Sequence, residues 1–306
     1  MSQLPLVTVG ILSYNNSKYL YETLQSVANQ SYKNTEIIIH DDASTDNSIE
    51  IIKSWIDNNL HLKVYFIASK KNLGVCKSLN KVISLSNGKY ICTIGSDDMY
   101  LPQFIEKRVQ FLKNTDETVG LCYSWSYIIN ETRKEMIKER RGKNPSGYIF
   151  DQITEGVSSL CKPFTMLVKR DVYLKDGLFD ETLYYEDLDW FLRVSKKHQI
   201  LFYDSYDTIY RELQNSLGTK LYSTENGILS QLRIIEKNIG YSKVGDRNLD
   251  KRFRALIVRS HQSFPNLAFE ISKKRLEYFP SVEARALNLS LKLGLPVGKL
   301  YKMIRP

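Results

Sequence analysis

Short apolar runs alternate with amphipathic segments through the first hundred residues of the chain. Four of these runs are rich in β-branched residues and end at glycine or polar turn residues, which predicts buried strands at residues 6–14, 36–40, 62–68 and 90–94. The segments between them place apolar residues near helical spacing, as the series Tyr19, Leu20, Leu24 and Val27 does. Strands that alternate with helices predict a mostly parallel sheet with right-handed crossovers.

The second part of the chain has a less regular pattern. Residues 119–129 predict a strand or hairpin arm, residues 133–143 a charged exposed loop, and residues 164–168 a strand followed by a turn at 171–174. A helix through Trp190 comes next, and then two strand segments at 199–203 and 208–210. From about residue 223 onward the spacing of apolar residues is helical, with a break at Pro265. We therefore expect an α/β domain over 1–216, Rossmann-like in its first half, and a basic α-helical region over 217–306.

Composition is that of an ordinary globular protein, with 42% hydrophobic and 25% charged residues among 306. No segment approaches the length of a membrane-spanning helix, and the N-terminus lacks the pattern of a signal peptide, so a cytoplasmic location is expected. The four cysteines are widely and unequally spaced, which favours buried thiols over a disulfide frame or a zinc site. The four histidines form no ligand pair at helical spacing.

Positive charge is concentrated near the C-terminus. From Tyr241 onward there are 14 Lys and Arg against 5 Asp and Glu, a balance equal to the whole net charge of +9. Such asymmetry indicates contact with an anionic surface. We expect either an anionic membrane surface or, alternatively, a helical cap or homodimer interface with a solvated basic face; no recognition motif supports nucleic-acid binding.

Two adjacent acids, Asp97 and Asp98, follow the predicted strand at 90–94. Neighbouring carboxylates repel each other unless a cation or hydrogen-bond donors lie between them. Because ligands of open α/β sheets bind at the carboxyl ends of the strands, a divalent metal and a phosphate-bearing substrate are expected here. The alternative is a simple turn and helix cap before Pro102.

Polar motifs also follow the other strands, in a fixed order along residues 6–216. They are Ser13-Tyr14-Asn15 after the first strand, the acidic run 41–46 after the second, Asn72-Leu73-Gly74 with Lys77 and Asn80 after the third, and Glu186-Asp187 before a helix. Together with Asp97 and Asp98, this series resembles a family 2 glycosyltransferase with the GT-A fold, of the kind that builds bacterial polysaccharide or lipopolysaccharide.

The resemblance implies a role for each matching residue. Ser13, Tyr14 and Asn15 border the nucleobase, Asp42 meets the edge of a uracil or thymine ring, Asn72 and Asn80 support the nucleotide pocket, and Lys77 contacts the phosphates or the base. Asp97 binds the nucleotide through Mg²⁺ or Mn²⁺, with Asp98 as a second acid of the metal site. Asp187 is the catalytic base, and Tyr185 and Glu186 are candidates for the acceptor side.

Two positions depart from the family pattern. The metal motif of the family begins with an acid, and this chain has Gly95 there; many relatives carry a histidine near the phosphates where this chain has Leu213. The chain therefore lacks the acid to which the family pattern assigns a ribose or water-mediated metal contact.

The expected activity is inverting transfer of a sugar from a UDP- or dTDP-sugar donor to a glycan or lipid-linked oligosaccharide acceptor. An alternative is a catalytically inactive binding or assembly subunit at the inner face of the membrane, which Gly95 would suit. A sugar nucleotidyltransferase is disfavoured, because the residues after the first strand, 14–17, do not form a basic, glycine-rich phosphate loop.

Overall fold

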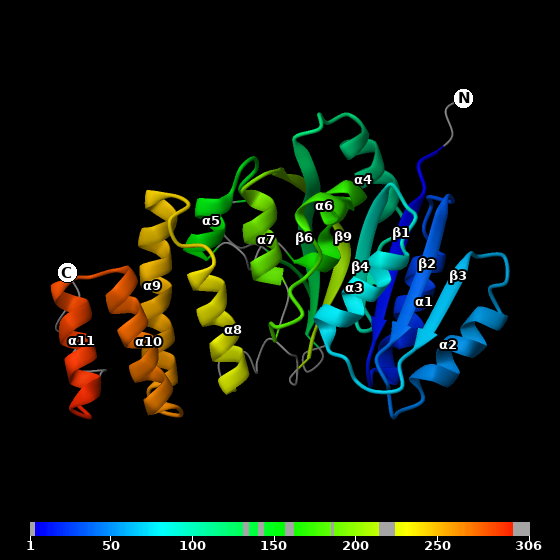
Figure 1. The fold of residues 1–306 in the computed structure, drawn as a ribbon. Helices are drawn as coiled ribbons and strands as arrows, with labels where there is room; N and C mark the ends of the chain where they lie inside the picture. The colour runs from blue at the N-terminus through cyan, green and yellow to red at the C-terminus, as the bar shows by residue number, and fades with distance from the viewer. Residues whose placement is uncertain are drawn as a thin grey trace. The chain divides into compact units, whose positions relative to one another are not determined.

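The computed structural model describes residues 4–130, 135–139, 144–156, 162–184, 187–213 and 224–295. The chain divides into two compact units (Figure 1). The first, here called the sheet unit, comprises Met1–Gln152, Gly156–Glu181 and Glu186–Leu213; the second, the helical unit, comprises Ile153–Glu155, Thr182–Tyr185 and Gln214–Pro306.

The first half of the sheet unit is a parallel α/β sheet. Its strands are β1 (Val7–Ser13), β2 (Thr35–Asp41), β3 (Val64–Ala68) and β4 (Tyr90–Gly95), which lie in the order β3-β2-β1-β4. The helices that connect them are α1 (Ser17–Ala28), α2 (Ser48–Asp57) and α3 (Val75–Leu85). This alternation confirms the predicted Rossmann-like half.

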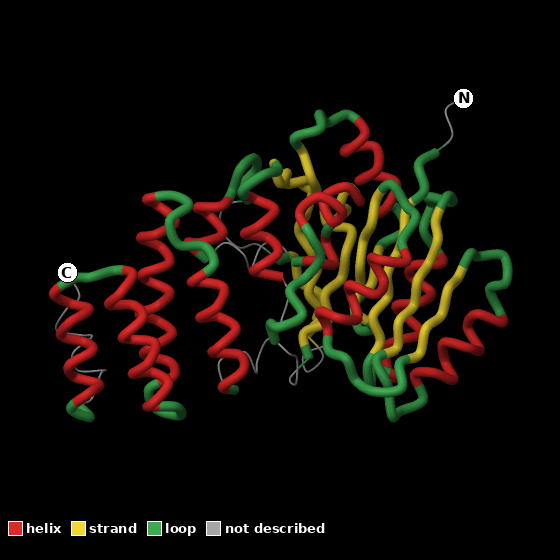
Figure 2. The backbone as a smooth tube through the Cα atoms, viewed as in Figure 1, coloured by secondary structure: helices red, strands yellow, loops and turns green. Residues whose placement is uncertain are grey.

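The second half extends the same sheet (Figure 2). Its strands run in both directions. The strands are β8 (Leu167–Lys169), β6 (Val119–Asn130), β9 (Gln199–Glu212) and β5 (Met99–Tyr100), in that order beyond β4, with β7 (Glu135–Lys138) paired to β6. The β6–β9 pair is parallel, and β8, β5 and β7 are antiparallel to their neighbours. The helices are α4 (Phe104–Lys113), α6 (Arg170–Asp176) and α7 (Asp187–Ser195), and α5 (Phe150–Glu155) extends across the limit of the two units.

Both faces of this sheet are covered, as in other α/β proteins. On one face Leu20 of α1, Trp55 of α2 and Phe104 of α4 join a buried cluster that includes Cys92 of β4. Side chains alternate between the two faces along a strand, so Ile91 lies on the opposite face. That opposite face carries the pocket described below.

The helical unit is made of α8 (Glu225–Glu236), α9 (Lys243–Ser260), α10 (Pro265–Tyr278) and α11 (Val282–Lys292). Thr224, Ser242 and Ser281 each accept a backbone N–H at the start of a helix, the usual N-cap contact. Ile228 and Phe253 are central to its apolar core. Among the helices that the structure describes, none is both long and apolar enough to cross a membrane.

Several expected elements have different limits in the structure. The predicted turn at 171–174 lies inside α6, and the predicted loop at 133–143 contains β7. Residues 199–203 and 208–210 belong to a single strand, β9, and register shifts against β6 interrupt the pattern that a regular strand would show. Cys76, Cys92 and Cys122 are buried free thiols, as predicted, and Cys161 lies outside the described residues.

Candidate active site

The carboxyl ends of β1 and β2 are joined by side-chain hydrogen bonds around Asp41. Asp41 is fully buried, and its carboxylate accepts the hydroxyl of Ser13 (2.9 Å) and both the backbone N–H (2.8 Å) and the hydroxyl (2.6 Å) of Ser44. The Ser44 hydroxyl oxygen in turn accepts the backbone N–H of Asn15 (2.9 Å). Asn15 has a positive φ of 50°, and Tyr14 before it is 49% exposed. The turn after β1 is therefore fixed, and it leaves the ring of Tyr14 accessible.

Asp42 connects this turn to the start of α3. Its carboxylate accepts the backbone N–H groups of Leu73 (2.8 Å) and Gly74 (2.9 Å), and its carbonyl oxygen accepts the Asn72 side-chain amide (3.4 Å). Gly74 has φ = 85°, a conformation that favours glycine. Lys77 is exposed on α3. The structure thus places Asp42 in direct contact with the Asn72 segment.

Asp97 and Asp98 lie in the turn after β4, held between α1 and β9. The backbone N–H of Arg211 donates to Oδ1 of Asp98 (2.9 Å), and its Nε donates to the carbonyl oxygen of Asp97 (3.1 Å). The hydroxyl of Thr23 donates to the carbonyl oxygen of Asp98 (2.7 Å). The Arg211 guanidinium also forms an ion pair with Glu22 (2.6 Å). Asp98 is only 6% exposed, whereas Asp97 is half-buried.

Burial disfavours the charged form of both acids. It raises the pKa of Asp97, although the nearby positive charge of Arg211 opposes this. Burial also raises the pKa of Asp98 well above its ordinary value, and the negative charge of Asp97 adds to the effect. A cation bound between them would remove this cost.

Gly95 leaves room for the Asp97 carboxylate. A Cβ added at Gly95 would lie 2.9 Å from Oδ1 of Asp97, closer than real Cβ contacts allow. Among the described residues no group of three or more His, Cys, Asp or Glu could enclose a metal ion. A divalent cation held by Asp97 would therefore take most of its ligands from phosphates and water, which is how Mg²⁺ is commonly bound. The residues present fit a cation of this kind.

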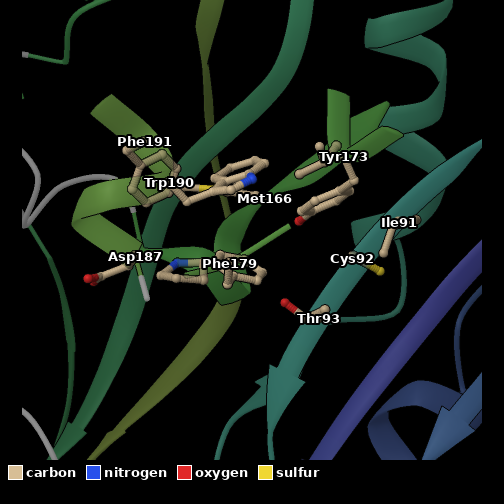
Figure 3. Close-up of a pocket in the computed structure, with 11 residues that line it drawn as sticks. Ile91, Cys92, Thr93, Met166, Tyr173, Phe179, Asp187, Trp190 and Phe191 are labelled. Carbon is tan, nitrogen blue, oxygen red and sulfur yellow. The ribbon is translucent and has the colours of Figure 1, made fainter. Parts of the chain in front are cut away.

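Asp187 is the first residue of α7 and lines a pocket (Figure 3). Its Oδ1 accepts the backbone N–H of Leu188 (2.6 Å), and its carboxylate points away from the aromatic rings. Burial raises the pKa of Asp187. The other residues that line the pocket are Ile91, Cys92, Thr93, Pro163, Met166, Val168, Tyr173, Phe179, Trp190 and Phe191. Tyr185 and Glu186, expected on the acceptor side, lie outside the described residues.

Comparison with known families decides the class of the protein. The profile of glycosyl transferase family 2 matches residues 8–175, more than half of the chain. The chain belongs to glycosyl transferase family 2. The predicted family and enzyme class, a transferase, are thereby confirmed.

Curated relatives of this family 2 chain agree. It is 33% identical to an uncharacterised glycosyltransferase of Methanocaldococcus jannaschii over 62% of this chain and 64% of the relative. It is 30% identical to an uncharacterised glycosyltransferase of Haemophilus influenzae over 80% and 77% of the two chains. Chondroitin synthase of Pasteurella multocida is 25% identical over 81% of this chain, which corresponds to only 25% of that enzyme. The matched part thus spans less than two thirds of the first relative and a quarter of the third.

Solved structures show the fold. TarS of S. aureus, in complex with UDP-GlcNAc, superposes with a TM-score of 0.69 over 94% of this chain and 87% of TarS, at 15% identity. A mannosyltransferase of Pyrobaculum calidifontis, in complex with GDP-Man and Mn²⁺, gives 0.61 over 99% and 83% at 16% identity. The predicted fold class is therefore confirmed.

Sequence reasoning on this family 2 chain missed two residues that support the site. Arg211 lies 113 residues from Asp98 and contacts it through a backbone N–H, which no side-chain motif can reveal. Asp41 is part of the acidic run after β2, but its buried contact with Ser13 was not predicted. Asn80, for which the resemblance implies support of the nucleotide pocket, bonds the backbone of Phe179 in both directions (2.9 Å each), beside the pocket that Asp187 lines.

Proposed function

We propose that the chain transfers a sugar, with inversion, from a nucleoside diphosphate donor to a glycan or lipid-linked acceptor in surface polysaccharide synthesis. The observation that carries this proposal is a hydrogen bond between the turn after β1 and the turn after β4, which lie at the same edge of the sheet. The Asn16 amide, next to the hydrogen-bonded turn of β1 and β2, donates to the hydroxyl of Ser96 (3.1 Å), next to Asp97. A nucleotide bound at the first turn would therefore bring its diphosphate to the acids. The likeness to chondroitin synthase supports polysaccharide synthesis.

The donor nucleotide is proposed to lie against the ends of β1 and β2. Tyr14 offers an exposed ring for the base, and Asn15 and Ser13 shape the turn beneath it. Asp42, whose carboxylate also accepts the backbone N–H groups of Leu73 and Gly74, is proposed to meet the edge of a pyrimidine. Uracil and thymine present the same edge, so UDP and dTDP both suit this assignment. TarS, which was solved with UDP-GlcNAc, supports a uridine donor, whereas the mannosyltransferase with GDP-Man makes GDP the alternative.

Asp97 is proposed to hold one Mg²⁺ or Mn²⁺, which when bound neutralises the diphosphate leaving group. Asp98, fixed by Arg211, contributes negative charge next to it. Asn72 and Lys77 lie on the turn and the helix that follow β3, where they would support the nucleotide and its phosphates. The mannosyltransferase complex with Mn²⁺ supports a divalent cofactor.

Asp187 is proposed as the general base. A sugar hydroxyl is a very weak acid, so its proton must pass to a carboxylate as its oxygen bonds to the anomeric carbon. The bond from that carbon to the diphosphate oxygen breaks, and the proton stays on Asp187. Burial raises the pKa of Asp187, which makes its carboxylate a stronger base. Tyr185 and Glu186 are proposed to line the acceptor side.

The test is calorimetric titration with UDP, dTDP and GDP, with and without Mn²⁺. We expect metal-dependent binding of a pyrimidine nucleotide to the wild type and its loss in Asp97→Ala. Asp171→Ala is the matched control, because Asp171 is 71% exposed on α6 and paired only with Lys175 among the described residues. If no nucleotide binds, the chain is an inactive binding subunit and the proposal is wrong.

A peripheral location at the inner face of the membrane is proposed for the helical unit, with a homodimer as the alternative. On α11 the side chains of Val282 (84% exposed), Leu289 (55%) and Leu293 (62%, just beyond the helix) recur at helical spacing, and the exposed Arg285 and Lys292 lie among them. Basic and apolar side chains together suit an anionic lipid surface. Co-sedimentation with vesicles that is indifferent to anionic lipid and to salt would exclude it, and light scattering tests the dimer.

A further inference from the structure

A row of aromatic side chains lies on one face of the β6–β9 strand pair. Its ring centroids are 5.4 Å apart for Phe202 and Trp125, 6.0 Å for Trp125 and Tyr206, and 5.4 Å for Tyr206 and Tyr127. Trp125 and Tyr206 are almost parallel, at 12°. These four residues are called the aromatic row. None of them has a part in the donor or metal site described above.

The aromatic row lies on the same face of the sheet as the Asp187 pocket. Leu121 of β6 pairs with Val168 of β8, and Val168 adjoins Ile91 of β4. Val168 and Ile91 both line that pocket, and paired residues on neighbouring strands share a face. Because side chains alternate along a strand, Trp125 lies on the same face as Leu121. The row therefore extends the pocket face along the sheet.

Irregular pairing brings the rings together. Between Phe202 and Tyr206 the strand β9 advances four residues while β6 advances two, from Tyr123 to Trp125. Such a bulge re-aims side chains and is common beside active sites. On the opposite face of β6, by contrast, Ser124 accepts a hydrogen bond from the buried Arg108.

The four rings of the row are not fully buried in the core. Trp55 and Trp190 are each only 2% exposed, whereas Trp125 is half-buried, as are the other three rings. The row also has polar neighbours: Nζ of Lys138 lies 5.2 Å from the ring centroid of Tyr206, and the Tyr206 hydroxyl donates to the carbonyl oxygen of Glu139 (2.9 Å). The rings stand at different angles, since Phe202 is edge-on to Trp125 (80°) and Tyr127 is tilted against Tyr206 (48°). Aromatic side chains with a few polar groups among them are the residue types that line ligand sites.

The row leads to the metal motif. From Tyr206 the strand β9 continues for five residues to Arg211, about 16 Å at the rise of a β-strand. Arg211 then bonds Asp98. A chain-like ligand that lies along the row can therefore place one of its ends near the acids of the proposed metal site.

We propose that the aromatic row binds the glycan acceptor by stacking against its pyranose rings. Sugars present C–H groups on their ring faces and hydroxyls at their edges, so they pair with aromatic faces bordered by polar groups. Four rings that follow one another along the two strands suit a chain of two or more sugars better than a monosaccharide. This inference rests on the proposed function, because it assigns the acceptor of that same reaction.

Tryptophan fluorescence tests the proposal directly. The chain has three tryptophans, and two of them are buried, so a ligand on the row changes mainly the emission of Trp125. We expect a saturable change when chondroitin hexasaccharide or chitohexaose is added to the full chain, and its loss in Trp125→Phe. By calorimetry, Tyr127→Ala should weaken binding about three- to tenfold, the range of a single aromatic contact.

Tyr65→Ala is the matched control, because Tyr65 is exposed on β3 and also carries a lysine, Lys63, over its ring. Its affinity for both oligosaccharides should equal that of the wild type, and the melting temperature of each variant shows whether it is folded. The proposal is overturned if neither oligosaccharide alters the wild-type emission, or if Tyr65→Ala weakens binding as much as Tyr127→Ala.

A parallel titration with UDP separates this inference from the proposed function. If UDP binds and the oligosaccharides leave Trp125 unaffected, the row is not the acceptor site and the proposed function stands. If the oligosaccharides bind at Trp125 and no nucleotide binds, the row is a glycan site and the transferase proposal fails.

Discussion

The backbone N–H of Arg211 donates to Oδ1 of Asp98 at 2.9 Å, which fastens strand β9 to the turn that carries both acids. Any residue at position 211 other than proline keeps this N–H, so the place of Asp98 is fixed by the backbone. The guanidinium adds a bond to the Asp97 carbonyl oxygen and a charge near both carboxylates. The acids are thus held in place before any ligand arrives, at the expense of stability.

Asp98→Asn should stabilise the metal-free protein at neutral pH. Burial raises the pKa of Asp98 in the folded protein well above 3.8, the ordinary value that it has in the unfolded chain. At a pH between the unfolded and the folded pKa, the folded state therefore holds more protons than the unfolded chain. Stability of the wild type therefore falls as the pH rises through that window, and the variant lacks this fall. Asparagine still accepts the Arg211 N–H. We expect a gain of about 1 kcal/mol, or about 2–4 °C in Tm.

Scanning calorimetry with a chelator, at several values of pH from 4 to 8, measures this effect. Asp171→Asn is the control, since Asp171 is 71% exposed. Equal Tm values for wild type and Asp98→Asn throughout that range would show that the buried charge costs nothing.

On the proposal that Asp187 is the general base, Asp187→Asn should lower kcat by about 10²–10⁴ and leave nucleotide affinity unchanged, because it removes only the proton acceptor. In the wild type the base must be ionised, so kcat falls as the pH drops through the folded pKa. Burial raises that pKa above 3.8, which moves the acid limb of the kcat profile to higher pH than an ordinary aspartate gives. Steady-state rates across pH 4–8 measure both, and Asp171→Asn, at a position 71% exposed, is the control. Unchanged kcat in Asp187→Asn would assign the base elsewhere.

The sequence was most informative where local pattern decides structure. The alternation of apolar runs and amphipathic segments predicted β1 to β4 and their helices, and the acids at 97 and 98 were placed correctly after β4. Contacts between distant segments were not predictable, because strand pairing and backbone hydrogen bonds leave no trace in residue type. The bond from Arg211 to Asp98 and the bulged pairing of β6 with β9 are of this kind. The turn expected at 171–174 became helix α6 because its tertiary packing outweighs local preference.

Asn80→Ala should destabilise the sheet unit by about 1–3 kcal/mol. Asn80 is buried, its amide donates to the carbonyl oxygen of Phe179 (2.9 Å) and to Glu181 (3.0 Å), and its oxygen accepts the Phe179 N–H (2.9 Å). Alanine leaves these backbone groups without their partner, and Phe179 lines the Asp187 pocket. Urea unfolding measures the loss. The exposed Asn58→Ala, which removes a bond to Ser54 within one helix, should cost less than about 0.5 kcal/mol; equal losses would refute the argument.

Asp250→Ala should destabilise the helical unit by about 3–5 kcal/mol, because it leaves a buried guanidinium without its main partner. Arg275 is 1% exposed, and its Nε and Nη2 donate to the two carboxylate oxygens of Asp250 at 2.7 and 3.1 Å. Its Nη1 has no hydrogen-bond partner within the described part of the chain. Without Asp250 the Arg275 guanidinium keeps only the more distant Glu283, at 3.6 Å, among its acidic partners in the described part of the chain. The double variant with Arg275→Met removes this poorly paired charge, so it should recover most of the loss.

Chemical unfolding of the full chain, followed by the emission of Tyr and Trp, measures all three proteins. The surface pair Lys273–Glu270, with side chains 45% and 59% exposed, supplies the control, and Lys273→Ala should change stability by no more than about 0.5 kcal/mol. If Asp250→Ala lowers the free energy of unfolding no more than Lys273→Ala does, the ion pair between Asp250 of α9 and Arg275 of α10 does not hold these helices together. If the double variant is as unstable as Asp250→Ala, the loss arises from packing around residue 250 and not from the unpaired charge.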